Sequence, residues 1–406
     1  MGVKRKKQIS GAMSFIILMG IISLFSDMTH EGARSILGKY LNLVGASAAT
    51  IGFVSGIGEL CGYSLRLLSG FVADKTKKYW TFIIVGYALQ VLAIPALALI
   101  PENGWFYACC LVVLERIGKA IKKPAKNTLA SFASSEIGMG KGFAYQEFLD
   151  QLGAFLGPVI LFVVAMVKGT SNLLLTYRIC FVILGIPALI TISLVLLSKF
   201  KYPNPEMFEK SKEEPIEDFK FKKSFIFYMI AICLFAFGFV DFTLITLHTA
   251  KTQVFPEATL SLLFAGAMVV DAFAALFFGW LFDKIGLKAL MLSTFCSAFF
   301  ACFIFITGSS VMIAIGIILW GIGMGAQESI MKAAVGNIIP RSMRSTGFGI
   351  FETGFGIAWF AGSWLMGILY DIDPQWLVVT SVSGQLVAIP FYWMCLRLKT
   401  LEQKVN

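Results

Sequence analysis

Carboxylic acids lie inside long apolar stretches of this sequence, where an ionised group is costly. A charge at the centre of a bilayer costs about 2.5–3.5 kcal/mol even on the most lenient insertion scale. Such acids must face water, pair with a base or hold a proton, so they could take up and release protons during a functional cycle. Ten acids qualify: Asp27, Glu31, Glu59, Glu115, Glu147, Asp150, Asp241, Asp271, Glu328 and Glu352.

The spacing of these acids places several of them on a common helix face with a base. Residues three, four and seven positions apart lie on one side of a helix. Burial favours the protonated acid, and a movable arginine favours the carboxylate, so Asp27 and Glu31 are the leading proton carriers. Either Arg34 or Arg116 could be the partner. The full set predicted to couple protons or line a cavity is Asp27, His30, Glu31, Arg34, Glu115, Arg116, Lys119, Glu147, Asp150, Asp241, Glu328, Lys332 and Glu352.

Two other interpretations of these charges stay open. A static network of ion pairs could simply hold helices together, and Glu59 with Arg66 fits that interpretation best. A transition metal would require clustered His, Cys and carboxylate ligands. Asp27, His30 and Glu31 approach this on one helix, but we predict no metal site.

The composition indicates that membrane helices carry these residues. Apolar residues make up 57% of the 406-residue chain and charged residues 14%, and the mean hydropathy is +0.79. A water-soluble fold could not cover so much apolar surface, which excludes a soluble enzyme. Runs of about 20 apolar residues, enough to cross a bilayer, predict twelve spans at 12–36, 47–72, 80–100, 105–130, 142–167, 173–198, 224–248, 257–281, 288–306, 309–335, 346–369 and 376–396.

Basic residues between the spans predict the orientation. Of the Lys and Arg side chains, 25 lie on the side that holds both termini and three on the other. The positive-inside rule then places both termini in the cytoplasm, with the protein in the cytoplasmic (inner) membrane. The net charge of +10 follows from this bias, so no nucleic acid is expected as a partner. The polar segment 199–223 divides the spans evenly, which predicts bundles at 1–198 and 224–406 joined by a cytoplasmic linker.

The two halves share three short patterns in the same order. Two six-span halves related by such a repeat are typical of secondary transporters, whose solute site lies near the midplane between the repeats. The matching pairs are LFSDMT around Asp27 and GFVDFT around Asp241, the loops Gly70 to Lys75 and Gly279 to Lys284, and KGFAYQE ending at Glu147 with TGFGIFE ending at Glu352.

With these loops the chain resembles the major facilitator superfamily over its whole length. The resemblance implies twelve helices in two six-helix bundles, with spans one, four, seven and ten around a central cavity. It also implies that Asp74 and Asp283 act as cytoplasmic gate contacts with a neighbouring helix end. One departure is Lys77, which stands where the family signature has its second glycine. The residues that carry the resemblance are Gly70, Asp74, Lys75 and Lys78 in the first loop, and Gly279, Asp283 and Lys284 in the second.

A further element lies on the fifth span. Gly153, Gly157 and Pro158 are similar to the GxxxGP element of proton-coupled antiporters in that superfamily, although Leu161 and Phe162 stand where glycines are expected. Small residues at this spacing also let helices pack closely. Both interpretations stay open.

The fourth span ends in an unusually basic segment, residues 116–126. It could form a positive vestibule that attracts anionic or zwitterionic solutes, or it could anchor the helix against anionic lipid. We expect proton coupling and charge recognition chiefly in the N-terminal half, which carries most of the buried charges.

Together these features predict a secondary active transporter that works by alternating access. There is no ATP-binding motif, so a proton gradient is the expected energy source, and no cofactor or enzyme activity is expected. The leading hypothesis is proton-coupled export, by antiport, of a small organic solute. Proton-coupled uptake or facilitated diffusion of a polar metabolite is the alternative, and a lipid flippase is a third. The expected partners are a small-molecule substrate, protons and the lipid bilayer, and we expect a monomer.

Overall fold

The regular elements of the described chain are helices. The computed structural model describes residues 10–46, 62, 65–168, 172–209, 222–254 and 257–405. Over these ranges, nine helices are long and apolar enough to cross a membrane. The helix of predicted span four is also long, but its many charges leave it outside that group. The protein is therefore an all-α membrane protein, as the composition predicts.

The first half is a bundle of long helices. Ser10 begins the first helix, because its hydroxyl accepts the Met13 N–H at 3.2 Å. Asn172 caps the sixth in the same way, from the Leu175 N–H at 3.0 Å. The helices are α1 (Gly11–Leu43), a helix described over 65–76, α3 (Tyr79–Ala96), α4 (Trp105–Ile137), α5 (Met139–Lys168) and α6 (Leu173–Lys201). Most of predicted span 47–72 lies outside the described residues.

The second half repeats this pattern with interrupted helices. The predicted span 224–248 is broken at Phe239, whereas 288–306 and 309–335 are each one helical span that contains an irregular turn. The elements are α7 (Lys223–Gly238), α8 (Phe242–Thr252), α9 (Glu257–Ile285), α10 (Leu287–Ser297), α11 (Phe300–Phe305), α12 (Ser310–Ala326), the π-helical turn η3 (Gln327–Met331), α13 (Lys332–Ile338), α14 (Arg344–Ile372) and α15 (Pro374–Val405).

The break between α7 and α8 has a local physical reason. Phe239 leaves the helical region, with φ −90° and ψ 116°. The Val240 carbonyl, which loses its place in the helix, accepts the Trp320 indole N–H at 2.9 Å. A buried carbonyl without such a donor would be costly. Asp241 directly follows this break.

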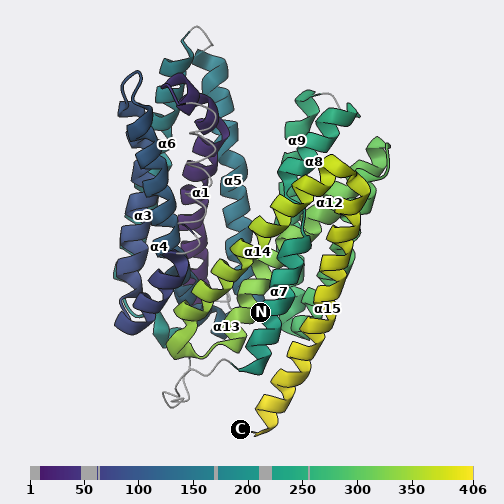
Figure 1. The fold of residues 1–406 in the computed structure, drawn as a ribbon. Coiled ribbons are helices and arrows are strands. Elements are labelled where there is room, and N and C mark those ends of the chain that lie inside the picture. Colours follow the sequence, from purple (N-terminus) through teal and green to yellow (C-terminus); the bar gives the residue numbers. More distant parts are fainter. Residues whose placement is uncertain are drawn as a thin grey trace, which may run out of the picture.

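The described residues of the two halves stand side by side and converge toward one end (Figure 1). At that end, which holds the C-terminus and which we call the closed end, α5 packs on α9 and α4 packs on α14. Toward the opposite, open end the ribbons of the two halves diverge. Within the described residues, the hydrogen bonds and ion pairs between the halves lie in the part of the bundles nearer the closed end.

The start of the predicted linker is folded. α6 continues to Lys201, beyond the predicted boundary at residue 198, and a short 3₁₀ helix, η2 (Pro205–Phe208), follows. Phe208 packs against Phe15 of α1, with 5.9 Å between ring centroids. Aromatic packing of this kind ties the first residues after α6 to the N-terminal bundle.

Candidate functional site

Asp74 joins the first half to the start of α14 at the closed end. Its carboxylate accepts the backbone N–H of Ser345 at 3.2 Å and of Thr346 at 2.5 Å. The Tyr79 hydroxyl donates to it at 2.9 Å. Free N–H groups and the helix dipole make a helix N-terminus favourable for a carboxylate. Gly70 allows the approach, because a Cβ there would clash with the Ser345 carbonyl.

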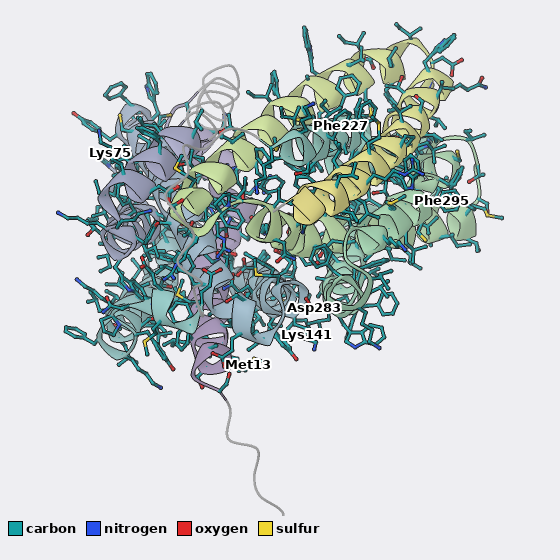
Figure 2. All side chains as sticks on the ribbon, turned by 90° about the horizontal axis from the view of Figure 1, so that it is seen from below. Met13, Lys75, Lys141, Phe227, Asp283 and Phe295 are labelled. Atoms are coloured by element: carbon teal, nitrogen blue, oxygen red, sulfur yellow. The ribbon has the colours of Figure 1, made fainter. Side chains whose placement is uncertain are left out.

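Asp283 makes the matching contact from the second half. It accepts the N–H groups of Gly140 at 2.7 Å and Lys141 at 3.0 Å, at the start of α5. Seen from below, Asp283 and Lys141 lie next to each other where the halves meet (Figure 2). Gly279 packs directly on Gly140. Both aspartates thus contact a helix end of the other half, the arrangement expected of a gate.

Lys77, the departure from the family signature, makes a contact of its own. Its backbone is left-handed, with φ 56°, close to the φ of 61° at Gly286 in the second loop. A lysine there is strained by about 1 kcal/mol relative to glycine. Its ammonium donates to the Ser342 carbonyl across the halves at 2.7 Å, which offsets part of that strain. Lys75, Lys78 and Lys284 are exposed.

A buried ion cluster lies deeper in the interface, around Glu352 of α14. Glu352 accepts from Arg66 at 3.2 Å and pairs with Lys123 at 2.8 Å. Asn127 adds a hydrogen bond at 3.4 Å. All three partners belong to the first half, so Glu352, which stands alone on its own span, is paired across the interface. Glu59, the predicted partner of Arg66, lies outside the described residues.

A second cluster, which we call the carboxyl cluster, gathers three acids around one amide. The Gln151 amide nitrogen lies 3.1 Å from Glu147, 3.3 Å from Asp271 and 3.2 Å from Glu328. Lys332 pairs with Glu147 at 3.0 Å. Glu147 and Gln151 come from α5, whereas the other three residues come from the second half. The π-helical turn η3 carries Glu328, and such turns often occur at functional sites.

Within the first half, His30 of α1 connects two residues of α4. Its Nδ1 lies 2.9 Å from a Glu115 oxygen, and its Nε2 lies 3.1 Å from the Lys119 ammonium. The Nε2 atom also lies 3.6 Å from a Glu31 oxygen, so this imidazole is in contact with two acids and one lysine. Arg116 adds an ion pair with Glu115 at 3.5 Å.

The remaining charges of α1, α4 and α5 are also brought together. Glu31 pairs with Arg34 at 3.5 Å near the open end. Lys126 bonds to Ser23 and pairs with Asp150 at 3.4 Å. Asp27 is half-buried, and its charge acts on Lys126. The predicted N-terminal face is therefore a connected network. Over the described residues, no group of three His, Cys, Asp or Glu side chains is arranged so that it could hold a metal ion.

Several residues of these sites have partners that the sequence does not predict. The sequence places Gln151 one helical turn from Glu147 and Asp271 within an apolar span, but it does not indicate that the two residues meet. Lys123 lies one turn from Lys119 on α4, but its partner Glu352 lies in the other half. The linker contact was not foreseen: Arg344 binds both oxygens of Glu209, at 2.7 and 2.9 Å.

The GxxxGP element packs α5 against α1. A Cβ at Gly153 would clash with the Leu24 carbonyl, and one at Gly157 with the Met28 carbonyl. The contact between these helices needs both glycines, so the structure accounts for them by packing.

The fold and these interfaces are those of a membrane transporter built from two similar halves. The sequence model of the Major Facilitator Superfamily matches residues 9–253 and again 241–405. The chain belongs to this superfamily. The double match agrees with the internal repeat seen in the sequence.

Similar proteins agree with this assignment. An uncharacterized protein of Mycobacterium tuberculosis is 34% identical over 383 residues, covering 93% of this chain and 92% of that protein. An uncharacterized MFS-type transporter of Methanocaldococcus jannaschii is 25% identical over 386 residues, covering 92% of each. The fold is similar to the crystal structure of a bacterial homologue of the iron transporter ferroportin in an outward-facing state, with a TM-score of 0.75 and 13% identity over 94% of this chain and 99% of that one.

Proposed function

We propose that this protein exports a small organic solute across the cytoplasmic membrane in exchange for protons. The observation that carries the proposal is the carboxyl cluster. The Gln151 amide has two N–H groups, so it cannot satisfy three carboxylates. If all three acids were ionised, Lys332 would still leave two net negative charges in a buried interface. We therefore expect the cluster to hold at least one proton while the halves are joined.

Opening of the closed end would take this cluster apart. Glu147 and Gln151 would move with the first half, and Asp271, Glu328 and Lys332 with the second. Carboxyl groups that reach water ionise and release their protons. Proton release would therefore accompany opening of the closed end, and proton uptake would occur in the conformation that is open at the other end.

The orientation decides the direction of proton movement. The closed end carries most of the basic residues and is the end predicted to face the cytoplasm. Protons would then load from outside and leave inside. Lys119 and Lys122 of α4 make their contacts with residues outside the carboxyl cluster, so a carrier could return with protons and without solute, which is exchange.

Proton-coupled uptake is the second candidate. The lysines of α4 favour it, because positive charge beside a solute site allows an anion and a proton to be bound in the same state. The two candidates differ in the sign of solute flow relative to the proton gradient.

The test uses the purified full chain in proteoliposomes loaded with a pooled metabolite and drug library. A pH gradient of either sign is imposed, and mass spectrometry reports which solutes cross. Solute flow opposite to the proton flow supports export. Flow in the same direction supports uptake. Flow that ignores the gradient contradicts proton coupling, and the acids are then structural.

The Glu328→Gln variant tests the cluster itself. Removing one proton-binding group should reduce gradient-driven transport at least ten-fold and leave solute exchange without a gradient intact. Asp373→Asn, at the open end between α14 and α15, is the matched control and should behave like the parent protein. Undiminished gradient-driven transport by Glu328→Gln would remove the cluster from the mechanism.

A further inference from the structure

We propose that the transported solute is an anion, whose carboxylate or phosphate group binds between Lys119 and Lys122 of α4. This inference names the substrate class, rests on the proposed transport function and holds for either direction of transport. It derives from the partners that the lysines of α4 have in the structure.

Lys122 carries a buried amine whose contacts are neutral groups. Its side chain is 5% exposed. Its Nζ donates to the Ser26 hydroxyl at 3.1 Å and lies 3.6 Å from the centre of the Tyr87 ring. Of the carboxylate oxygens in the described part of the chain, none lies within 4.0 Å of it. A buried charge is normally paired, whereas Asp27 and Asp150 act on this amine only from farther away.

Lys119, one turn earlier on the helix, is likewise held by a neutral group. Its ammonium donates to His30, and the carboxylates of the described residues lie more than 4.0 Å away from it. Glu115, which could have paired with it, is occupied by His30 at 2.9 Å and Arg116 at 3.5 Å. The His30 bond holds Lys119 in place, and Glu31 and Glu115 act on its ammonium only from beyond 4.0 Å.

The other two lysines on this part of α4 provide the comparison. Lys123 pairs with Glu352 at 2.8 Å and Lys126 with Asp150 at 3.4 Å. Lys123 and Lys126 therefore each have a carboxylate partner. Nearer the open end, Lys119 has an imidazole instead, and Lys122 has a hydroxyl and an aromatic ring. A bound anion would complete this arrangement with charge-assisted hydrogen bonds.

The position of these lysines also suits a solute that enters between the halves. Lys119, Arg116 and Glu31 are each partly exposed, although they lie within helices that cross the membrane. An anion arriving from the open end would meet Lys119 first and Lys122 behind it. The positive charge would raise the local concentration of anions and reject cations.

The experiment measures binding rather than transport. The purified full chain is mixed with acidic, neutral and basic fractions of the metabolite library, and its melting temperature is recorded. A ligand that binds the folded state raises that temperature. We expect the acidic fraction to stabilise the protein and the concentration needed to rise at least ten-fold in the Lys119→Met, Lys122→Met double variant.

Two further variants separate binding from folding. Methionine has a similar volume and removes an uncompensated charge, so the double variant should remain folded. Lys122→Arg keeps the charge and should retain most of the anion response. Lys288→Met, at the exposed start of α10, should respond like the parent protein.

The inference is overturned if only neutral or basic fractions stabilise the protein, if no fraction at millimolar concentration does, or if the double variant responds unchanged. Its failure is distinct from failure of the proposed function. Proton-coupled flux of a neutral solute would reject the anion site and keep the coupling. Anion binding with flux indifferent to pH would reject the coupling and keep the site.

Discussion

At the scale of residues, the charges of this protein act mainly through partners on other helices. Glu352 has no base one turn away on its own helix, yet it contacts three residues of the other half. Lys332 and Glu328, one turn apart, both join a cluster centred on Gln151. The chemistry of each acid therefore depends on whether the halves are joined.

Glu352→Gln tests this dependence. The substitution keeps the shape of the side chain but removes the negative charge that Glu352 offers to Lys123 and Arg66. Loss of one partner of a buried ion pair costs about 3–5 kcal/mol, so the closed end should open more often. The measurement is the maleimide labelling rate of Ser345→Cys, a buried position beside Asp74, in a chain without its native cysteines. We expect at least a ten-fold rise.

The control for that measurement is Glu206→Gln. Glu206 pairs with Arg341 at 3.5 Å and is 42% exposed, and an exposed pair contributes about 0–1 kcal/mol. It should change the labelling rate little. Equal labelling in Glu352→Gln and the parent protein would mean that Glu352 does not stabilise the closed end.

At the scale of elements, close helix packing and helix breaks determine where the charges lie. Gly153 and Gly157 bring α5 against α1. The turn η3 positions Glu328 on the face toward α5. The segment after α6 crosses to the other half through Glu209 and Arg344. These features determine how closely neighbouring helices approach and therefore which charged side chains can reach one another.

Gly157→Leu separates the two interpretations of the GxxxGP element. A side chain at this position would meet the backbone of Met28 and Gly32, and overpacking of this kind costs about 1–3 kcal/mol or more. We expect a clearly lower melting temperature in detergent. The control is Gly38→Leu. Gly38 lies on α1, the helix that Gly157 packs against, but a Cβ there has open space, so this variant should melt near the parent protein. Normal melting with lost proton coupling in Gly157→Leu would favour the antiporter interpretation instead.

At the scale of the whole molecule, two bundles are joined at one end by a pair of matching contacts. Asp74 and Asp283 each hold a helix start of the opposite half. Hydrogen bonds to charged groups contribute about 1.5–3 kcal/mol each, so these contacts can hold one conformation and still be broken by ligand binding. Alternation then requires the contacts at the closed end to be exchanged for contacts at the open end.

Spin labels placed in pairs measure this exchange directly. One pair joins Asn103 to Gly308, in open-end loops of the two halves, and a second joins Lys75 to Lys284 at the closed end. In the absence of solute the closed-end pair should give the shorter distance. Conditions that drive turnover should shorten the open-end distance and lengthen the closed-end distance together. A change in one pair alone would contradict alternation of the two halves as rigid bundles.

The sequence alone was sufficient for the fold and the family. Apolar runs and few charges identify membrane helices because the bilayer requires about 20 apolar residues for each crossing. The repeated loops at Asp74 and Asp283 predicted the family, and the superfamily match confirms it. Apolar runs and short loop motifs are formed by residues close together in the sequence, so they can be recognised without the tertiary structure.

Only the tertiary structure decided which charged groups meet. Helical periodicity places Glu147 and Gln151 on one face, but it contains nothing about Asp271, which lies 120 residues away and reaches the same amide. The same holds for Glu352 with Lys123 and for the two lysines of α4 without carboxylate partners. Pairing across helices depends on how the bundles pack and on which end is closed, and the one-dimensional pattern of a single helix does not encode either.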